Sequence, residues 1–313
     1  GVAWTDTLQG LFMLSVVWVA AAWVVTALGG VGAATEGMLA ARPEFGGFGG
    51  GTYSPGFIVS TAITIAFGVT MFPQINQRFF VAKSAATLKR SFALWPVLVL
   101  LLFVPAFMLG AWAAGTPVEV PAGANVLPVV LAEYTPAWFA ALVIAGAIAA
   151  MMSSSDSMLL SGSSYFTRDL YRPVVNADAS ARREAWIARV GVVGFATLAF
   201  VASLFRPGTL IEVGGTAFSG FALLALPVIC ALYWARTTRT GMVVGIAVPQ
   251  AAYLTVVLSS VLPLVPTVPR TVLGGWDVAL GLMALSGALT VAASLATAAT
   301  ADGDASRFAV AGD

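Results

Sequence analysis

The feature that most constrains the fold of this chain is a series of apolar stretches, each about 20 residues long, that follow one another along the sequence. Such a stretch can cross the hydrocarbon core of a bilayer as an α-helix, because a helix satisfies its backbone hydrogen bonds internally. About eight of them are present, at residues 4–28, 56–77, 91–114, 137–166, 187–205, 210–234, 241–263 and 275–299. The sequence therefore predicts an all-α polytopic protein embedded in a lipid bilayer.

The composition supports this fold class and excludes several functions. Charged residues make up 9% of the chain, whereas soluble domains carry about 25%. The formal net charge of +1 gives no clustered basic excess of the kind that nucleic-acid binding needs. Without histidine, and with Cys230 as the single cysteine, the chain has neither a disulfide framework nor a cysteine metal cluster. No nucleophile and base occur together in a pattern that indicates an enzyme.

Basic residues predict how the spans are oriented. They are concentrated in three alternate loops, at Arg78, Lys83, Lys89 and Arg90, then Arg168, Arg172, Arg182, Arg183 and Arg189, then Arg236 and Arg239. Loops rich in Lys and Arg face the cytoplasm in membrane proteins. The chain is therefore expected in the cell (plasma) membrane, with both of its ends on the cytoplasmic side. The glycine-rich residues 44–56 and residues 116–128 are then external loops, the first either a plain connector or a mobile segment.

The sequences at the two ends of the chain lead to separate predictions. The chain enters its first span almost at once, without a charged leader or a small-residue cleavage site. A signal peptide is therefore not expected, and we expect that earlier residues are missing from the sequence. Residues 301–313 are polar and small, which predicts a disordered cytoplasmic tail.

The fourth span carries an unusual polar face. At 3.6 residues per turn, one side of this helix collects Gly146, Ala150, Ser153, Ser154, Ser157, Ser161 and Ser164. One explanation is close helix packing, because small residues let helices approach in lipid. Another is a cation site, since sodium is bound by hydroxyl and carbonyl oxygens. Ser153, Ser154 and the carbonyl of Ala150 would supply three oxygens, and a second helix the rest.

Asp156 lies beside this face. A carboxylate inside a membrane span is costly and usually functional. A structural role, such as a hydrogen bond to a neighbouring helix, is the alternative.

Four stretches together resemble the sodium:solute symporter family. They are "AAMMSSSDSMLL" followed by "TRDLYR", then "GVAWTDTLQG", "FPQINQRFFVAKS" and "LYWARTTRTG". In motif style the chain is most similar to the monocarboxylate and pantothenate branch. The resemblance implies a leucine-transporter-type fold, in which two five-helix units repeat with inverted topology.

The same resemblance implies how the chain is divided. Residues 1–300 would be the transmembrane transporter domain, followed by the tail. Residues 1–28 correspond to the last helix of the first repeat, 56–234 to the second repeat and 241–299 to peripheral helices. The N-terminal helices that complete the core are expected to be missing, so the resemblance implies a partial fold.

The family's sodium site maps onto the Ala150 carbonyl and the hydroxyls of Ser153 and Ser154. A second sodium arrangement, known in some members, implies Asp6 together with Ser153, Asp156 and Ser157. For Asp6 the alternative is an ordinary N-terminal helix cap. Sodium ion is thus the expected coupling ion.

The substrate site is expected around a break in the second span. Pro73 lacks an amide hydrogen, so the carbonyl of Val69 should lose its helical partner. With Gly68 nearby, this helix is a candidate for the discontinuous element that such transporters place against substrate. The resemblance implies Ile65, Gly68, Val69 and Phe72 as substrate-site residues, whereas a lipid-facing proline kink is the alternative.

Together these features predict a secondary transporter that uses sodium to import a small organic solute, with a carboxylate among the expected classes. The aliphatic side chains of Ile65 and Val69 argue against sugars and proline. A symporter-like sensor module and a nonfunctional transporter fragment are the alternative hypotheses.

Overall fold

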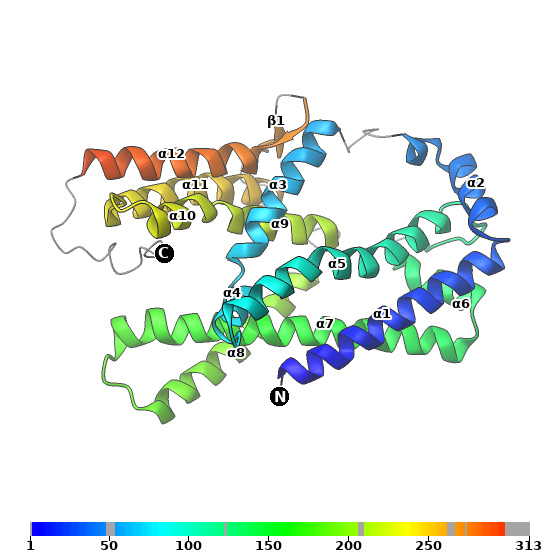
Figure 1. Ribbon diagram of the computed structural model, residues 1–313, viewed down its shortest axis with the longest axis horizontal. Coiled ribbons are helices and arrows are strands. Elements are labelled where there is room, and N and C mark those ends of the chain that lie inside the picture. The colour runs from blue at the N-terminus through cyan, green and yellow to red at the C-terminus, as the bar shows by residue number, and fades with distance from the viewer. Residues whose placement is uncertain are drawn as a thin grey trace. The chain divides into compact units, whose positions relative to one another are not determined.

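The computed structural model describes residues 2–47, 54–121, 124–205, 210–261, 267–272 and 274–297, and Figure 1 shows them almost entirely as helices. Seven of the described helices are long and apolar enough to cross a membrane, or eight spans result if the bent pair of α3 (Pro55–Met71) and α4 (Pro73–Phe80) forms one. This confirms the expectation of an all-α polytopic membrane protein. The predicted tail at 301–313 and the centre of the loop at 44–56 lie outside the described residues.

The chain divides into two compact units, Gly1–Gly50 with Phe79–Val192 and Gly51–Arg78 with Val193–Asp313. The first unit contains α1 (Val2–Ala27), α2 (Val31–Ala41), the 3₁₀ turn η1 (Pro43–Gly46), α5 (Ala85–Ala113), α6 (Val126–Tyr134), α7 (Ala137–Tyr165), the π-helical segment η2 (Phe166–Val175) and the start of α8 (Ala181–Leu204). The second unit contains α3, most of α4, the rest of α8, α9 (Leu210–Ala222), α10 (Ala225–Tyr233), α11 (Arg239–Val261), strands β1 (Thr271–Val272) and β2 (Trp276–Asp277), and α12 (Val278–Ala296).

The core of the first unit is formed by one apolar stripe of α1 packed against α5, α6 and α7. Its buried members on α1 are Val16, Ala20, Ala21 and Val24. Across from them lie Leu109, Val130, Leu131, Phe139, Ala140 and Val143. The indole of Trp18 donates a hydrogen bond to the Leu101 carbonyl at 2.8 Å, which ties α1 to α5.

Helix α7 continues without a break into η2, so that this helical segment runs from Ala137 to Val175 over 39 residues. A bilayer needs about 20. This helical segment is therefore longer than the hydrocarbon core requires.

The second unit is organised around two helix pairs, α3 with α9 and α11 with α12. Along α11, Gly241 and Gly245 allow the backbone to approach α12, because a Cβ at either position would collide with Ser294 or Thr290, respectively. A short antiparallel hairpin pairs Thr271 with Asp277 and leads into α12. The Asp277 carboxylate caps α12 by accepting a hydrogen bond from the Ala279 N–H at 2.8 Å.

Candidate functional site

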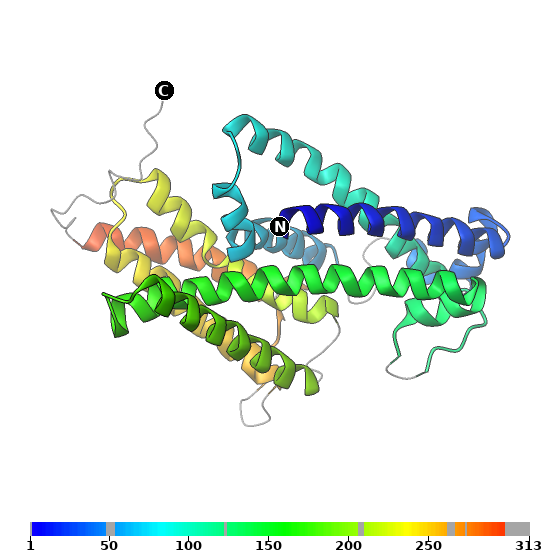
Figure 2. The same cartoon turned by 90° about the horizontal axis from the view of Figure 1, so that it is seen from below.

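Helices α1 and α7 lie antiparallel, and their contacts fix the register of the candidate ion site. The rings of Trp23 and Phe139 are 5.0 Å apart at one end of the pair. Further along, the ring of Phe12 lies against Gly146, where an added Cβ would be 2.9 Å from Phe12 Cε1. Moving toward the N-terminus of α1 therefore means moving toward the C-terminus of α7, as Figure 2 shows for the two helices.

This register brings Asp6 level with the serines. Starting from the Phe12–Gly146 contact, Asp6 lies about 9 Å back along α1 at 1.5 Å per residue, and Ser153 about 10 Å forward along α7. The backbone of Asp6 is thus at the height of Ser153, with Ser157 one turn further. The side chain of Asp6 lies outside the described residues.

The three residues expected to bind sodium lie within five consecutive positions of α7 but differ in exposure. Ala150 and Ser153 are half-buried, whereas Ser154 is exposed. Ser155, between this set and Asp156, is exposed as well, and its hydroxyl donates a hydrogen bond to the Met151 carbonyl at 2.9 Å. A helix thus presents the Ala150, Ser153 and Ser154 oxygens within one turn of one another.

Of the expected second set, Ser157 is half-buried and Asp156 is exposed. The carboxyl group of Asp156 therefore lies on a more exposed side of α7 than the Ser157 hydroxyl.

Further along the helix, the packing interpretation holds. Ser161 and Ser163 are buried. The Ser163 hydroxyl donates to the Ala188 carbonyl of α8, and Ser164 donates to the Leu160 carbonyl at 2.8 Å. The hydroxyls of Ser163 and Ser164, at the C-terminal end of α7, therefore serve helix structure.

Gln9 is a polar residue of this region to which the sequence analysis gave no role. Its Oε1 atom is buried and has no hydrogen-bond partner within the described part of the chain. By the register above, Gln9 is level with Ala149 and Ala150. Gln9 could have been noticed in the sequence as a polar residue one turn from Phe12, on an otherwise apolar stripe of α1.

The break in the second span is present as expected. Helices α3 and α4 meet at an angle of 53° on either side of Phe72. Pro73 has no N–H to donate to the Val69 carbonyl, which accepts a hydrogen bond from the Phe72 N–H at 3.3 Å instead. A tighter final turn of α3 replaces the hydrogen bond that Pro73 cannot make.

Two of the four expected substrate residues are used for packing inside the second unit. Gly68 lies directly against the Phe218 carbonyl of α9, where a Cβ could not fit. Phe72 is buried, with its ring 4.9 Å from Phe218 and 4.5 Å from Phe221. Ile65 is exposed and Val69 is half-buried, so these two side chains remain accessible.

The stripe of α3 that contains Gly68 also contains Ser60 and Thr64, both fully buried. Ser60 donates to the Gly56 carbonyl at 2.6 Å and accepts a hydrogen bond from the Asp277 N–H at 3.0 Å. This polar stripe was not singled out from the sequence, and it fixes α3 to the hairpin before α12.

Comparison with known proteins agrees with the resemblance seen in the sequence motifs. A model of the sodium:solute symporter family matches residues 1–248. The chain is 23% identical to a sodium/pantothenate symporter of Haemophilus influenzae over 80% of this chain and 52% of the relative. It is 26% identical to a sodium/proline symporter of the same organism over 79% of this chain and 51% of the relative.

A shorter match, 35% identical over 34% of this chain and 16% of the relative, is to an uncharacterized symporter of Cupriavidus necator. The chain spans about half the length of the relatives that it matches over most of its own sequence.

Proposed function

Because the chain belongs to the sodium:solute symporter family, we propose that it forms part of a sodium-coupled symporter that moves a small organic solute across the plasma membrane by alternating access. The family is one of transporters and not of enzymes, in agreement with the expectation from the sequence. The apolar helices make the chain an integral membrane protein.

The observation that carries the proposal is the pairing of α1 with the serine segment of α7. Within one turn α7 offers the Ala150 carbonyl and the hydroxyls of Ser153 and Ser154 to one cation, and the register puts Asp6 at the same height. Hard oxygens are the ligands that sodium prefers. A carboxylate nearby offsets the cost of removing the ion from water.

A single coupled sodium ion supplies enough free energy for concentrative uptake. One positive charge crossing 100 mV provides about 2.3 kcal/mol, and a tenfold sodium gradient adds about 1.4 kcal/mol. The sum supports accumulation of roughly several hundredfold.

For the solute we propose a small molecule that carries a carboxylate. Pantothenate and proline, for which the matched relatives are named, share that group. The accessible positions Ile65 and Val69 are aliphatic, which favours a solute with an apolar portion at this point of the site.

The test is uptake by the full protein in proteoliposomes. The probes are labelled pantothenate and, as the carboxylate that the aliphatic side chains of Ile65 and Val69 disfavour, labelled proline. Each is offered with an inward sodium gradient or an equal potassium gradient at the same membrane potential. We expect sodium to drive accumulation of at least one carboxylate, and Ser155→Ala, whose hydroxyl bonds within α7, to behave as the wild type. Equal accumulation with potassium, or no accumulation of either probe, would reject the proposal.

The orientation can be tested separately. In a background with Cys230→Ala, single cysteines at Ala86, at the start of α5, and at Ala179, before α8, lie in two basic segments and should react with an impermeant thiol reagent only from the cytoplasmic side. A cysteine at Glu119, in a loop predicted to be external, should react only from outside. Reaction of all three from one side would contradict the proposed topology.

A further inference from the structure

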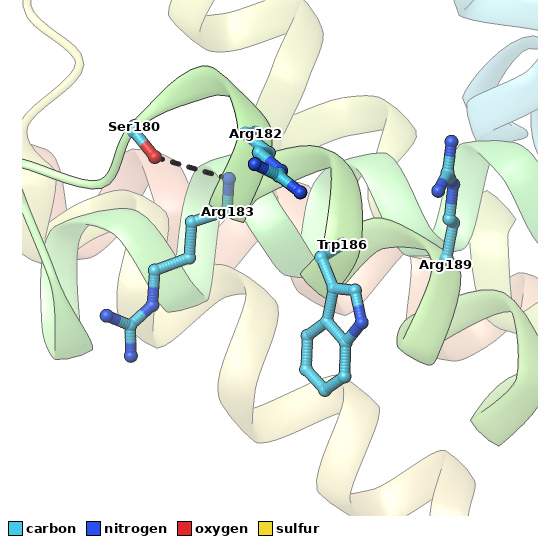
Figure 3. A pocket seen from close by; sticks show the side chains of 5 residues that line it. All are labelled: Ser180, Arg182, Arg183, Trp186 and Arg189. Carbon is cyan, nitrogen blue, oxygen red and sulfur yellow. Dashed lines mark hydrogen bonds between the residues drawn. The ribbon is translucent and has the colours of Figure 1, made fainter.

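At the start of α8 three arginines and a tryptophan surround a hollow of about 390 Å³. Its lining consists of Ser180, Arg182, Arg183, Trp186 and Arg189. All five lie in the first unit, within ten consecutive residues. Figure 3 shows the side chains of Arg182, Trp186 and Arg189 leaving the same stretch of helix, with Trp186 between the two arginines along the chain.

The positive charge of this hollow is not neutralised within the protein. In the described part of the chain, Glu184 pairs with Arg172, at 3.5 Å between Oε1 and Nε. None of Arg182, Arg183 and Arg189 forms an ion pair among the residues that the structure describes. The Ser180 hydroxyl interacts with the Arg183 backbone N–H, at 3.4 Å, so it caps the helix and leaves the guanidinium groups unoccupied.

The position of the hollow relative to a bilayer follows from the length of α8. The helix has 24 residues, Ala181–Leu204, and about 20 suffice to cross the hydrocarbon core. Its first turn, with Arg182 and Arg183, therefore reaches the headgroup layer. Trp186 is 60% exposed one turn later, which is the depth at which indole rings gather in membrane proteins. Arg189, further in, is long enough to extend back toward that layer.

We propose that this hollow is a binding site for the phosphate headgroup of an anionic phospholipid. The guanidinium groups bind phosphate oxygens through paired hydrogen bonds. Arg182 and Arg189, about 10 Å apart along the helix axis, approach the headgroup from both sides of Trp186, whose ring packs against the glycerol and upper acyl region. The site is separate from the serine segment of α7, and its occupant is a lipid of the surrounding membrane rather than a transported solute.

A free phosphate ion offers the same chemistry, but it would lack the apolar part that Trp186 contacts. The exposed indole next to the arginines therefore favours a lipid over a soluble anion.

The experiment measures lipid retention by the full protein, purified in a neutral detergent, using native mass spectrometry. The probes are phosphatidylglycerol and phosphatidylcholine, each added at the same mole fraction. We expect selective retention of phosphatidylglycerol, weakened about fivefold by each single Arg→Gln change at 182, 183 or 189. Trp186→Ala should weaken it as well, and Trp186→Phe should restore part of the retention.

The matched control is the triple variant Lys83→Gln, Lys89→Gln, Arg90→Gln, which removes the same charge from three exposed residues of another basic segment. It should retain phosphatidylglycerol as the wild type does, while Arg182→Gln, Arg183→Gln, Arg189→Gln together abolish selective retention. Equal losses in both triple variants would show a general charge effect and overturn the site. Displacement of the lipid by millimolar inorganic phosphate would overturn its assignment to a lipid. Circular dichroism of each variant verifies that the helices are intact.

Discussion

Phe12 of α1 lies against Gly146 of α7, so closely that a Cβ on Gly146 would be 2.9 Å from Phe12 Cε1. This contact lies about one turn before the polar segment that begins at Ala150. The contact fixes the register of the two helices, in which the backbone of Asp6 is level with Ser153.

We therefore expect Gly146→Leu to destabilise the first unit by about 1–3 kcal/mol, because the added side chain overpacks a closed contact. The measurement is thermal unfolding of the purified protein in detergent. Adding Phe12→Ala should relieve much of the loss. Gly10→Ala is the control, since no atom lies within 4 Å of a Cβ at that position, and an equal loss there would contradict the packing argument.

Ser153→Ala and Ser154→Ala should each raise the sodium concentration for half-maximal uptake on the order of tenfold, because each removes one oxygen bound to a charged group. Protein insertion should be unchanged. Ser155→Ala is the matched control in the same helix, because its hydroxyl donates to the Met151 carbonyl. If all three variants respond to sodium alike, the serines of this segment serve helix packing.

The spans were predictable because an apolar stretch of about 20 residues has few alternatives to a membrane helix. The ends of the helices were less predictable. Helices α5 and α8 begin at Ala85 and Ala181, before the predicted starts at residues 91 and 187. Both extensions contain lysines or arginines, which are good helix formers in the headgroup layer although they end an apolar pattern.

Contacts between helices could not be derived in the same way. The proline at 73 predicted the break between α3 and α4, but not that the Phe72 N–H would satisfy the Val69 carbonyl. Nor did the sequence alone place Gly68 against Phe218. Such a contact depends on which distant helix packs there, and small residues are compatible with many partners. The candidate ion ligands remain a prediction from the family resemblance, supported by the register of α1 and α7.

The close packing of α11 against α12 in the second unit can be tested at Gly245. Gly245→Leu should destabilise it strongly, by about 3 kcal/mol or more, because the side chain would collide with Thr290 and with the Ser286 carbonyl, 2.9 Å from an added Cβ. Gly281→Ala, on α12 with no atom within 4 Å, should instead be neutral or stabilising by about 0.4–1 kcal/mol. Chemical unfolding in mixed micelles measures both. Similar losses of stability for the two variants would argue against close packing of α11 and α12 at Gly245.

A pH dependence is expected from Asp277, which precedes α12 outside the membrane-spanning segment. Burial raises the pKa of its carboxyl above the usual value, although the Ala279 N–H and Arg270 act in the opposite direction. A folded state that holds its proton more tightly than the unfolded state loses stability as pH rises through the raised pKa. The loss should therefore develop above pH of about 4.

Asp277→Asn keeps a capping oxygen for α12 and removes the charge. The unfolding temperature of this variant relative to the wild type should be higher at pH 7 than at pH 4. Glu119→Gln, at an exposed position, is the control and should show no such trend. A constant difference across this pH range for Asp277→Asn would reject the role of burial.

The final prediction couples α1 to the serine segment. The backbone of Asp6 is level with Ser153, and Ser157 follows one turn later on α7. If one cation is shared by Asp6, Asp156 and Ser157, a half-built site no longer holds it. Asp6→Asn combined with Ser157→Ala should then weaken sodium dependence little more than Asp6→Asn alone.

Asp6→Asn should be the more damaging single change, because it removes the negative charge that offsets the desolvation of sodium. The measurement is a double-mutant cycle on the sodium concentration for half-maximal uptake by the full protein, with Ser155→Ala in place of Ser157→Ala as the control pair. Independent helix caps and packing contacts would give effects that add in the logarithm of sodium affinity. Strict additivity for Asp6 and Ser157 would exclude the shared site while leaving the simpler site at Ala150, Ser153 and Ser154 intact, since that site does not depend on the carboxylate of α1.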